Sequence, residues 1–287
     1  MIEKRNSLSK VGFGIAAMFG TVWAYNFLIQ PNIAFGMADW LKALIPTAVL
    51  YGLGLPLLLL IFGKSSPRAV APKSSLPAKQ FMSLLSLQYT AFLFLMILSM
   101  AGIAIWGMPT SAQPTFGLDA TSLFILLIFN PIAEEYVFRK LIADKVRPYG
   151  DKLFIFISAF CFSIVHGVAL GMPQVVYTFI LGLIWAYALV KTENILFPIV
   201  LHSLSNFLNN TVPLMLGHVA GLYTMLSLLI GLIAFIVLIV KRKNIRIDGS
   251  AGIISLKDAK LLITSPGLLL YTLFTVAVMV AKALMPQ

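Results

Sequence analysis

The chain has 287 residues, of which 60% are hydrophobic and 11% are charged, with a formal net charge of +11. Soluble domains are about half apolar and about a quarter charged, so this composition excludes an ordinary soluble protein. The basic excess does not indicate a nucleic-acid partner, because no aromatic–basic interleaving accompanies it and cytoplasmic loops of membrane proteins collect Lys and Arg. The single cysteine, Cys161, excludes an intrachain disulfide, and its apolar surroundings predict an inert core thiol.

Nine apolar runs predict membrane-spanning helices, since several reach 18 or more residues with few charges. In chain order they cover residues 11–30, 43–63, 83–107, 122–147, 152–169, 174–190, 195–212, 219–240 and 261–283. Runs at the chain ends are the least regular, so the prediction is an all-α polytopic transmembrane helix bundle of about 8–9 spans. We expect one integral membrane domain with three parts: N-terminal spans in 1–119, a central core in 120–212 and C-terminal spans in 213–287.

The distribution of basic residues predicts the orientation of these spans. With the N-terminus in the cytoplasm, all of the 21 Lys and Arg residues except Lys42 and Lys282 fall in cytoplasmic segments. This asymmetry is the one that cytoplasmic loops show. The sequence therefore predicts a multi-pass protein of the cell membrane, in contact with the lipid bilayer and with a cytoplasmic N-terminus.

The fourth run contains charged residues that are costly to place in lipid. Glu134, Glu135 and Arg139 follow Pro131 within otherwise apolar sequence. Such groups usually face a protein interior or a wet cavity, and they indicate function. Glu135 and Arg139 are four residues apart, which predicts an ion pair along one helix. Pro131 is expected to kink the helix and to free a backbone carbonyl.

The fifth run brings a histidine to the same depth. Spans four and five fold back at residues 148–151, and Glu134 and His166 each lie roughly 23–25 Å from that turn at about 1.5 Å per residue. The matched depths predict that these two side chains meet. The seventh run carries His202 and Asn206, which share one helix face.

These residue types suffice for hydrolysis of an amide bond inside the bilayer. A carboxylate beside a histidine can deprotonate water, and a second histidine and an amide can donate hydrogen bonds to an oxyanion. Glu134, His166 and His202 are also alternative zinc ligands, although they come from three helices and no HExxH motif is present. We favour a metal-free site with no cofactor, and zinc remains the alternative.

Three motifs in order resemble the CPBP family of intramembrane proteases, which includes the CAAX proteases and is also called the Abi family. The family pattern EExxxR, FxxxH and HxxxN is present as Glu134–Arg139, Phe162–His166 and His202–Asn206. The resemblance covers about residues 120–210. Tyr136 and Lys140 stand where Leu and Gly are usual in the family, which leaves the motif positions intact.

The resemblance implies a role for each motif residue. Glu134 would activate water together with His166, and His202 and Asn206 would stabilise the oxyanion. Glu135, Arg139 and Phe162 would orient the site. The resemblance also implies a membrane-embedded or lipid-anchored peptide as substrate, and the short loops suggest a bacterial-type member.

Two other functions fit parts of the pattern. A non-catalytic scaffold or bacteriocin-immunity protein of the same family would act by contact, but it would not need a buried Glu–His pair. A transporter could use Glu134 and His166 as a proton relay, but no repeat with paired broken helices is visible in the sequence. The prediction is therefore an intramembrane endopeptidase of unknown oligomeric state.

Overall fold

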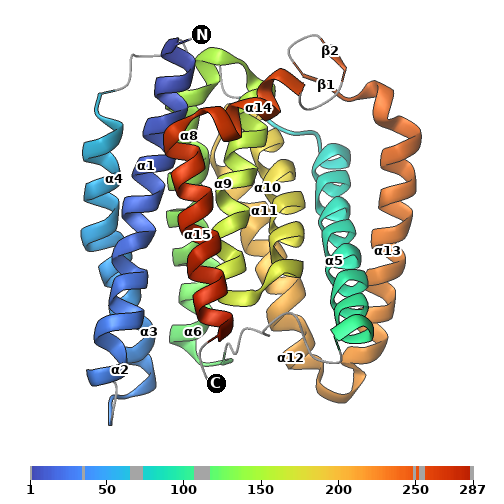
Figure 1. Cartoon of the computed structure of the whole chain (residues 1–287). Coiled ribbons are helices and arrows are strands. Elements are labelled where there is room, and N and C mark those ends of the chain that lie inside the picture. Colours follow the sequence, from blue (N-terminus) through green and yellow to red (C-terminus); the bar gives the residue numbers. More distant parts are fainter. Residues whose placement is uncertain are drawn as a thin grey trace. The chain divides into compact units, whose positions relative to one another are not determined.

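The computed structural model describes residues 2–33, 36–64, 74–106, 117–247, 250–251 and 256–284. Their contacts define two compact units. Unit 1 comprises Met1–Pro67 with Ser255–Gln287, and unit 2 comprises Arg68–Ile254. Figure 1 shows the helices of both units coloured along the sequence. The division of one membrane domain into three consecutive parts stays a prediction.

Unit 1 is built on the first helix of the chain. Its helices are α1 (Ile2–Ala24), α2 (Gln30–Ile33), α3 (Asp39–Val49), α4 (Leu55–Phe62), α14 (Leu256–Thr264) and α15 (Pro266–Leu284). Helix α1 packs against α4 and α15. The contact with α15 needs small residues, because a Cβ atom on Gly12 would overlap the backbone of Gly267. Close approach of this kind is a common way to join helices in lipid.

Unit 2 contains the motif residues. Its helices are α5 (Ala78–Trp106), α6 (Ala120–Phe124), α7 (Asn130–Glu135), α8 (Ile142–Val146), α9 (Asp151–Leu170), α10 (Met172–Thr192), α11 (Leu196–Asn206), α12 (Val212–Leu216) and α13 (Ala220–Lys241). The two-residue strands β1 (Arg246–Ile247) and β2 (Ser250–Ala251) form an antiparallel pair. A π-helical turn at Ile125–Phe129 links α6 to α7, and a second at Tyr136–Leu141 links α7 to α8. A third, at Phe207–Thr211, links α11 to α12.

The core of unit 2 lies around α9 and α10. Most side chains of α9 are buried, which fits a helix that is apolar on all sides. Helix α10 packs against α9, α5 and α11, and α5 packs against α13. Gly182 lets α10 approach α9, since a Cβ atom there would lie 2.9 Å from Cα of Ala159.

Eight helical stretches of the described residues are long and apolar enough to cross a membrane. The longest, Leu196–Lys241, has 46 residues. It would extend about 69 Å at 1.5 Å per residue, roughly twice the thickness of a bilayer core. Figure 1 shows the chain reversing between α12 and α13, where Gly217 has a φ of 52°. The stretch therefore holds two of the predicted spans, and the prediction of a polytopic helix bundle is confirmed.

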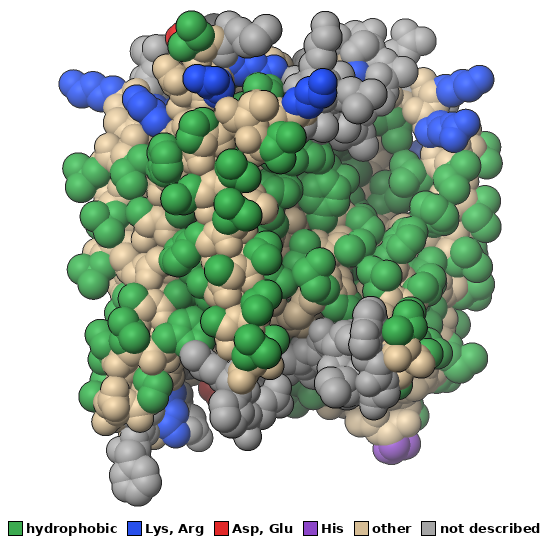
Figure 2. All heavy atoms as spheres, in the orientation of Figure 1, with side chains coloured by type: hydrophobic (Ala, Val, Ile, Leu, Met, Phe, Trp, Pro, Cys, Tyr) green, Lys and Arg blue, Asp and Glu red, His purple; other side chains and the backbone are tan. Residues whose placement is uncertain are grey.

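Helix α13 shows the surface expected of a span that faces lipid. Figure 2 shows apolar side chains along this surface. Leu222, Leu229 and Ile236 are among the exposed apolar side chains of the helix. His218 precedes one end of the helix, and Lys241 with Arg242 marks the other. The chain is thus a multi-pass membrane protein, while the cytoplasmic position of the N-terminus and the cell membrane as its location stay predictions.

Candidate functional site

A fully buried ion pair lies at the centre of unit 2. Arg139 Nε is 3.0 Å from Glu135 Oε2, and both side chains have zero exposure. The predicted i,i+4 pair is therefore confirmed. The guanidinium carbon lies 4.7 Å from the centroid of the Phe162 ring, a cation–π contact. Within the described ranges, the two terminal nitrogens of Arg139 have no hydrogen-bond acceptor.

His202 is held by the other oxygen of Glu135. Its Nδ1 lies 3.0 Å from Glu135 Oε1. Because the ion-paired carboxylate can only accept, Nδ1 must donate. In the neutral imidazole the lone pair is then at Nε2, which lies 3.8 Å from Glu134 Oε2. The Glu135 carboxylate thus selects the tautomer and turns Nε2 toward Glu134.

His166 reaches Glu134 from the opposite helix. Its Nδ1 lies 2.7 Å from the Phe162 carbonyl on α9, which can only accept. The Nε2 atom lies 3.9 Å from Glu134 Oε2. The matched depths therefore do bring Glu134 and His166 together. Each Nε2 atom therefore faces Glu134 Oε2 at a separation longer than a hydrogen bond.

The ring of Phe162 contacts both histidines of the site and a further aromatic ring. Its ring centroid lies 4.4 Å from that of His166 and 5.9 Å from that of His202. It also makes an edge contact with Phe138 at 5.3 Å. Phe162 thus packs against both histidines, while its role in orienting the site stays a prediction.

Asn206 docks α11 against the segment before Pro131. Proline lacks an N–H group, so the carbonyl four residues earlier, that of Leu127, loses its helical donor. The hydroxyl of Ser203 donates to this carbonyl at 2.7 Å. The Asn206 amide donates to the carbonyl of Leu126 at 2.9 Å, within the π-helical turn. The expected freeing of a carbonyl by Pro131 is thus confirmed.

Three residues beside the site were missed by the sequence analysis. Ser203 was detectable as a polar residue inside an apolar run. Trp185 stacks on the His202 ring, with centroids 4.0 Å apart and planes at 17°, and its indole Nε1 donates to Gln88. Neither Trp185 nor Gln88 has a spacing signal, because each contacts a residue far away in sequence. Cys161 is buried, as expected.

Among the described residues, no group of three or more His, Cys, Asp or Glu side chains is placed to hold a metal ion. Glu134, His166 and His202 nonetheless have the chemistry of zinc ligands, and each imidazole holds its Nδ1 against an acceptor as metal-bound histidines do.

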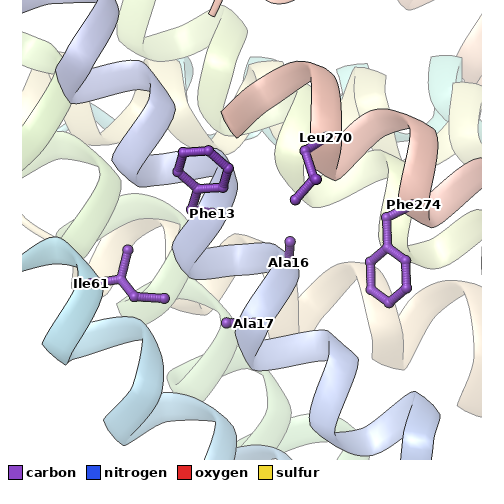
Figure 3. A pocket seen from close by; sticks show the side chains of 6 residues that line it. All are labelled: Phe13, Ala16, Ala17, Ile61, Leu270 and Phe274. Atoms are coloured by element: carbon purple, nitrogen blue, oxygen red, sulfur yellow. The ribbon is translucent and has the colours of Figure 1, made fainter. Parts of the chain in front are cut away.

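A groove in unit 1 has no polar chemistry. Unit 1 holds an open apolar groove of about 620 Å³ lined by Phe13, Ala16, Ala17, Ile61, Leu270 and Phe274 (Figure 3). No side chain that lines it can titrate or act as a nucleophile. The groove is therefore not a candidate catalytic site.

Comparison with known families agrees with the motif resemblance. Residues 116–208 match the family model described as "Type II CAAX prenyl endopeptidase Rce1-like". The match contains all the motif residues from Glu134 to Asn206 and lies entirely within unit 2. Comparisons with curated proteins and with solved structures gave no match. The bacterial type stays a prediction. Over residues 116–208, the chain is therefore similar to the Rce1-like CAAX prenyl endopeptidases.

Proposed function

We propose that this membrane protein is an intramembrane endopeptidase that hydrolyses a peptide bond in a membrane-embedded or lipid-anchored peptide. The family is one of proteases, which supports the reaction class. The observation that carries the proposal is the meeting of Glu134 Oε2 with His166 Nε2 at 3.9 Å and His202 Nε2 at 3.8 Å. Contacts of this length between acceptors suit a bridging water, which has two hydrogens to donate.

Glu134 is the proposed general base. It takes a proton from the water, whose oxygen then forms a bond with the carbonyl carbon of the substrate. His166 accepts from or donates to the same water through Nε2 and holds it in line. When the carbon–nitrogen bond breaks, the proton held by Glu134 passes to the leaving amine. The side chain of Glu134 is 20% exposed, whereas its Oε2 atom is buried and has no hydrogen-bond partner among the described residues, so it is free to accept from a water.

His202 and Asn206 are proposed to stabilise the oxyanion. The Asn206 amide carries two N–H bonds and uses one on Leu126, which leaves one for the substrate. His202 donates through Nδ1 to Glu135, so it can donate through Nε2 only as an imidazolium. Glu135 and Arg139 act as orienting residues, because their buried pair fixes the His202 ring.

Zinc-dependent hydrolysis is the alternative for the same three residues. Ligand atoms of a tetrahedral zinc site lie about 3.3 Å apart, which follows from zinc–ligand bonds of about 2.0 Å. The separations from Glu134 are wider, at 3.8 and 3.9 Å. Binding of zinc would therefore require these side chains to move closer together, whereas a bridging water fits the present separations.

Cleavage of defined peptides by purified protein tests the proposal. The full chain in liposomes is incubated with membrane-anchored peptides, prenylated and unprenylated, with and without a zinc chelator. Glu134→Gln is expected to lower kcat by about 10³-fold, because general bases contribute roughly 10²–10⁴ to the rate. Cleavage that resists the chelator supports the metal-free reaction. Cleavage that the chelator abolishes and zinc restores supports the zinc alternative.

A matched variant controls for the chemical change. Asp144→Asn also converts a carboxylate to an amide, on α8 of the same helical stretch, where Asp144 pairs with the exposed Lys140. It is expected to keep the wild-type rate. Equal rates for Glu134→Gln and wild type would contradict the protease proposal. A cellular phenotype that survives Glu134→Gln would favour a scaffold.

A further inference from the structure

Helix α5 directs one buried amide toward the site. Gln88 is 2% exposed, and its Oε1 accepts a hydrogen bond from the indole Nε1 of Trp185 at 3.2 Å. An indole N–H can only donate, so the amide must present its oxygen and not its nitrogen. Helix α5 lies outside residues 116–208, so the family match does not include Gln88.

Trp185 contacts both Gln88 and His202, since its indole donates to the amide and its ring stacks on the imidazole. The two rings are nearly parallel, with centroids 4.0 Å apart and planes at 17°. The hydrogen bond from His202 Nδ1 to Glu135 fixes one edge of the imidazole, but the ring can still tilt about that bond. A flat stack on its face removes the tilt. The hydrogen bond and the stack together determine where Nε2 points, which is toward Glu134.

Stability alone does not explain a glutamine at this position. Gln88 Nε2 is buried and has no hydrogen-bond partner in the described part of the chain. A buried polar group without a partner lowers the stability of the folded state. Methionine has a similar length and carries no such penalty. A glutamine here must therefore provide a benefit other than stability, and its only side-chain hydrogen bond among the described residues is with Trp185.

We infer that Gln88 is a positioning residue for His202 and acts through Trp185. Its carbonyl oxygen holds the indole in the plane that stacks on the imidazole, and the stack keeps His202 Nε2 directed at Glu134. The effect on reaction rate rests on the proposed function, whereas the effect on the His202 ring does not.

Nitrogen NMR of the histidine rings tests the positioning without any substrate. The chain has only three histidines, His166, His202 and His218, so ring-¹⁵N labelling gives a short spectrum. His202→Gln assigns the signals of His202. We expect the Gln88→Met variant to shift or broaden the His202 ring signals and to leave those of His218 unchanged.

Kinetics on a peptide that the wild type cleaves tests the consequence. Gln88→Met is expected to lower kcat by about tenfold and to leave KM within about twofold, because small displacements of a catalytic group cost up to roughly 10²-fold in rate. Trp185→Phe keeps an aromatic ring but removes the donor, so it should lower kcat by a similar factor. The double variant should be no slower than either single variant, since both remove the same hydrogen bond.

Thr90→Val is the matched control for a buried polar group on α5. Thr90 is 3% exposed and donates to the Gly231 carbonyl on α13 at 3.0 Å, away from His202. It should leave the His202 signals and kcat unchanged. Unchanged His202 signals in Gln88→Met would overturn the inference, even if the wild type cleaved no peptide. Shifted signals with wild-type kcat would overturn it as well. Failure of wild-type cleavage alone counts against the proposed function.

Discussion

Two ion pairs of identical spacing lie next to each other in the helical stretch Ala120–Tyr149 and differ in burial. Glu135 and Arg139 are both fully buried, whereas Lys140 and Asp144 keep 52% and 34% of their side chains exposed. The i,i+4 spacing brings both pairs into contact. Burial determines how much the loss of one partner changes the unfolding free energy. Water screens an exposed pair and solvates the remaining charge, whereas a buried charge that loses its partner cannot be solvated.

The buried pair is also part of a larger network. Glu135 contacts His202, and Arg139 lies over Phe162 and 5.4 Å from the ring of Trp185. In the exposed pair, Lys140 donates to both oxygens of Asp144, at 2.8 and 3.0 Å, and no further ion pair extends it among the described residues. A change in the first pair should therefore disturb the site, and a change in the second should not.

The largest effect is expected from Arg139→Met. This substitution leaves Glu135 as a buried carboxylate without its cation, which typically costs about 3–5 kcal/mol of unfolding free energy. Unfolding by SDS titration in bicelles measures the change. The double variant Glu135→Gln/Arg139→Met removes both charges and should be more stable than Arg139→Met. If the double variant were the less stable of the two, an uncompensated buried charge would not be the cause.

An intermediate effect is expected at the end of the same stretch. Arg147 is buried and donates to both oxygens of Glu193, at 2.7 and 2.5 Å, and to Asp151 at 2.6 Å. The two carboxylates are partly exposed, at 11% and 23%. Arg147→Met should therefore lower the unfolding free energy by about 1.5–3 kcal/mol, the range for hydrogen bonds to charged groups.

Arg147→Lys separates charge from geometry at this position. Lysine keeps the positive charge but cannot form the two parallel hydrogen bonds of the guanidinium. Glu193 has a φ of 50°, a left-handed conformation at the end of α10. The bidentate hydrogen bonds from Arg147 stabilise this conformation. The lysine variant should fall between Arg147→Met and wild type in the same unfolding experiment. A lysine variant as stable as wild type would show that the charge alone suffices.

The parts of the site that are local in sequence were predictable. Spacing identified the Glu135–Arg139 pair, depth matching brought Glu134 to His166, and the chemistry of proline identified a free carbonyl near Pro131. Burial was not predictable from spacing, since Arg139 and Lys140 are neighbours with opposite exposure. The stacking of Trp185 on His202 was also not predictable from the sequence, because no residue spacing relates side chains on α10 to side chains on α11.

The fold was predictable to the same extent. Apolar runs gave the number and the order of the spans, because hydrocarbon thickness sets the length of a helix. The packing of α1 against α15 in unit 1 was not predictable from the sequence, since it depends on which glycines face each other. Gly12 and Gly267 are far apart in sequence, and their backbones meet. Nothing in the pattern of hydrophobic residues distinguishes these glycines from others in the chain.

The smallest effect is expected from Lys140→Ala. An exposed i,i+4 pair contributes about 0.3–0.5 kcal/mol, and the order of lysine before aspartate is the less favourable one on a helix. The loss should also shrink in 1 M salt, because exposed charges are screened over about 3 Å at that ionic strength. The loss in Arg139→Met should persist in the same salt, because its pair is shielded from solvent. A cost above about 1 kcal/mol for Lys140→Ala, insensitive to salt, would mean that burial does not set the value of these pairs.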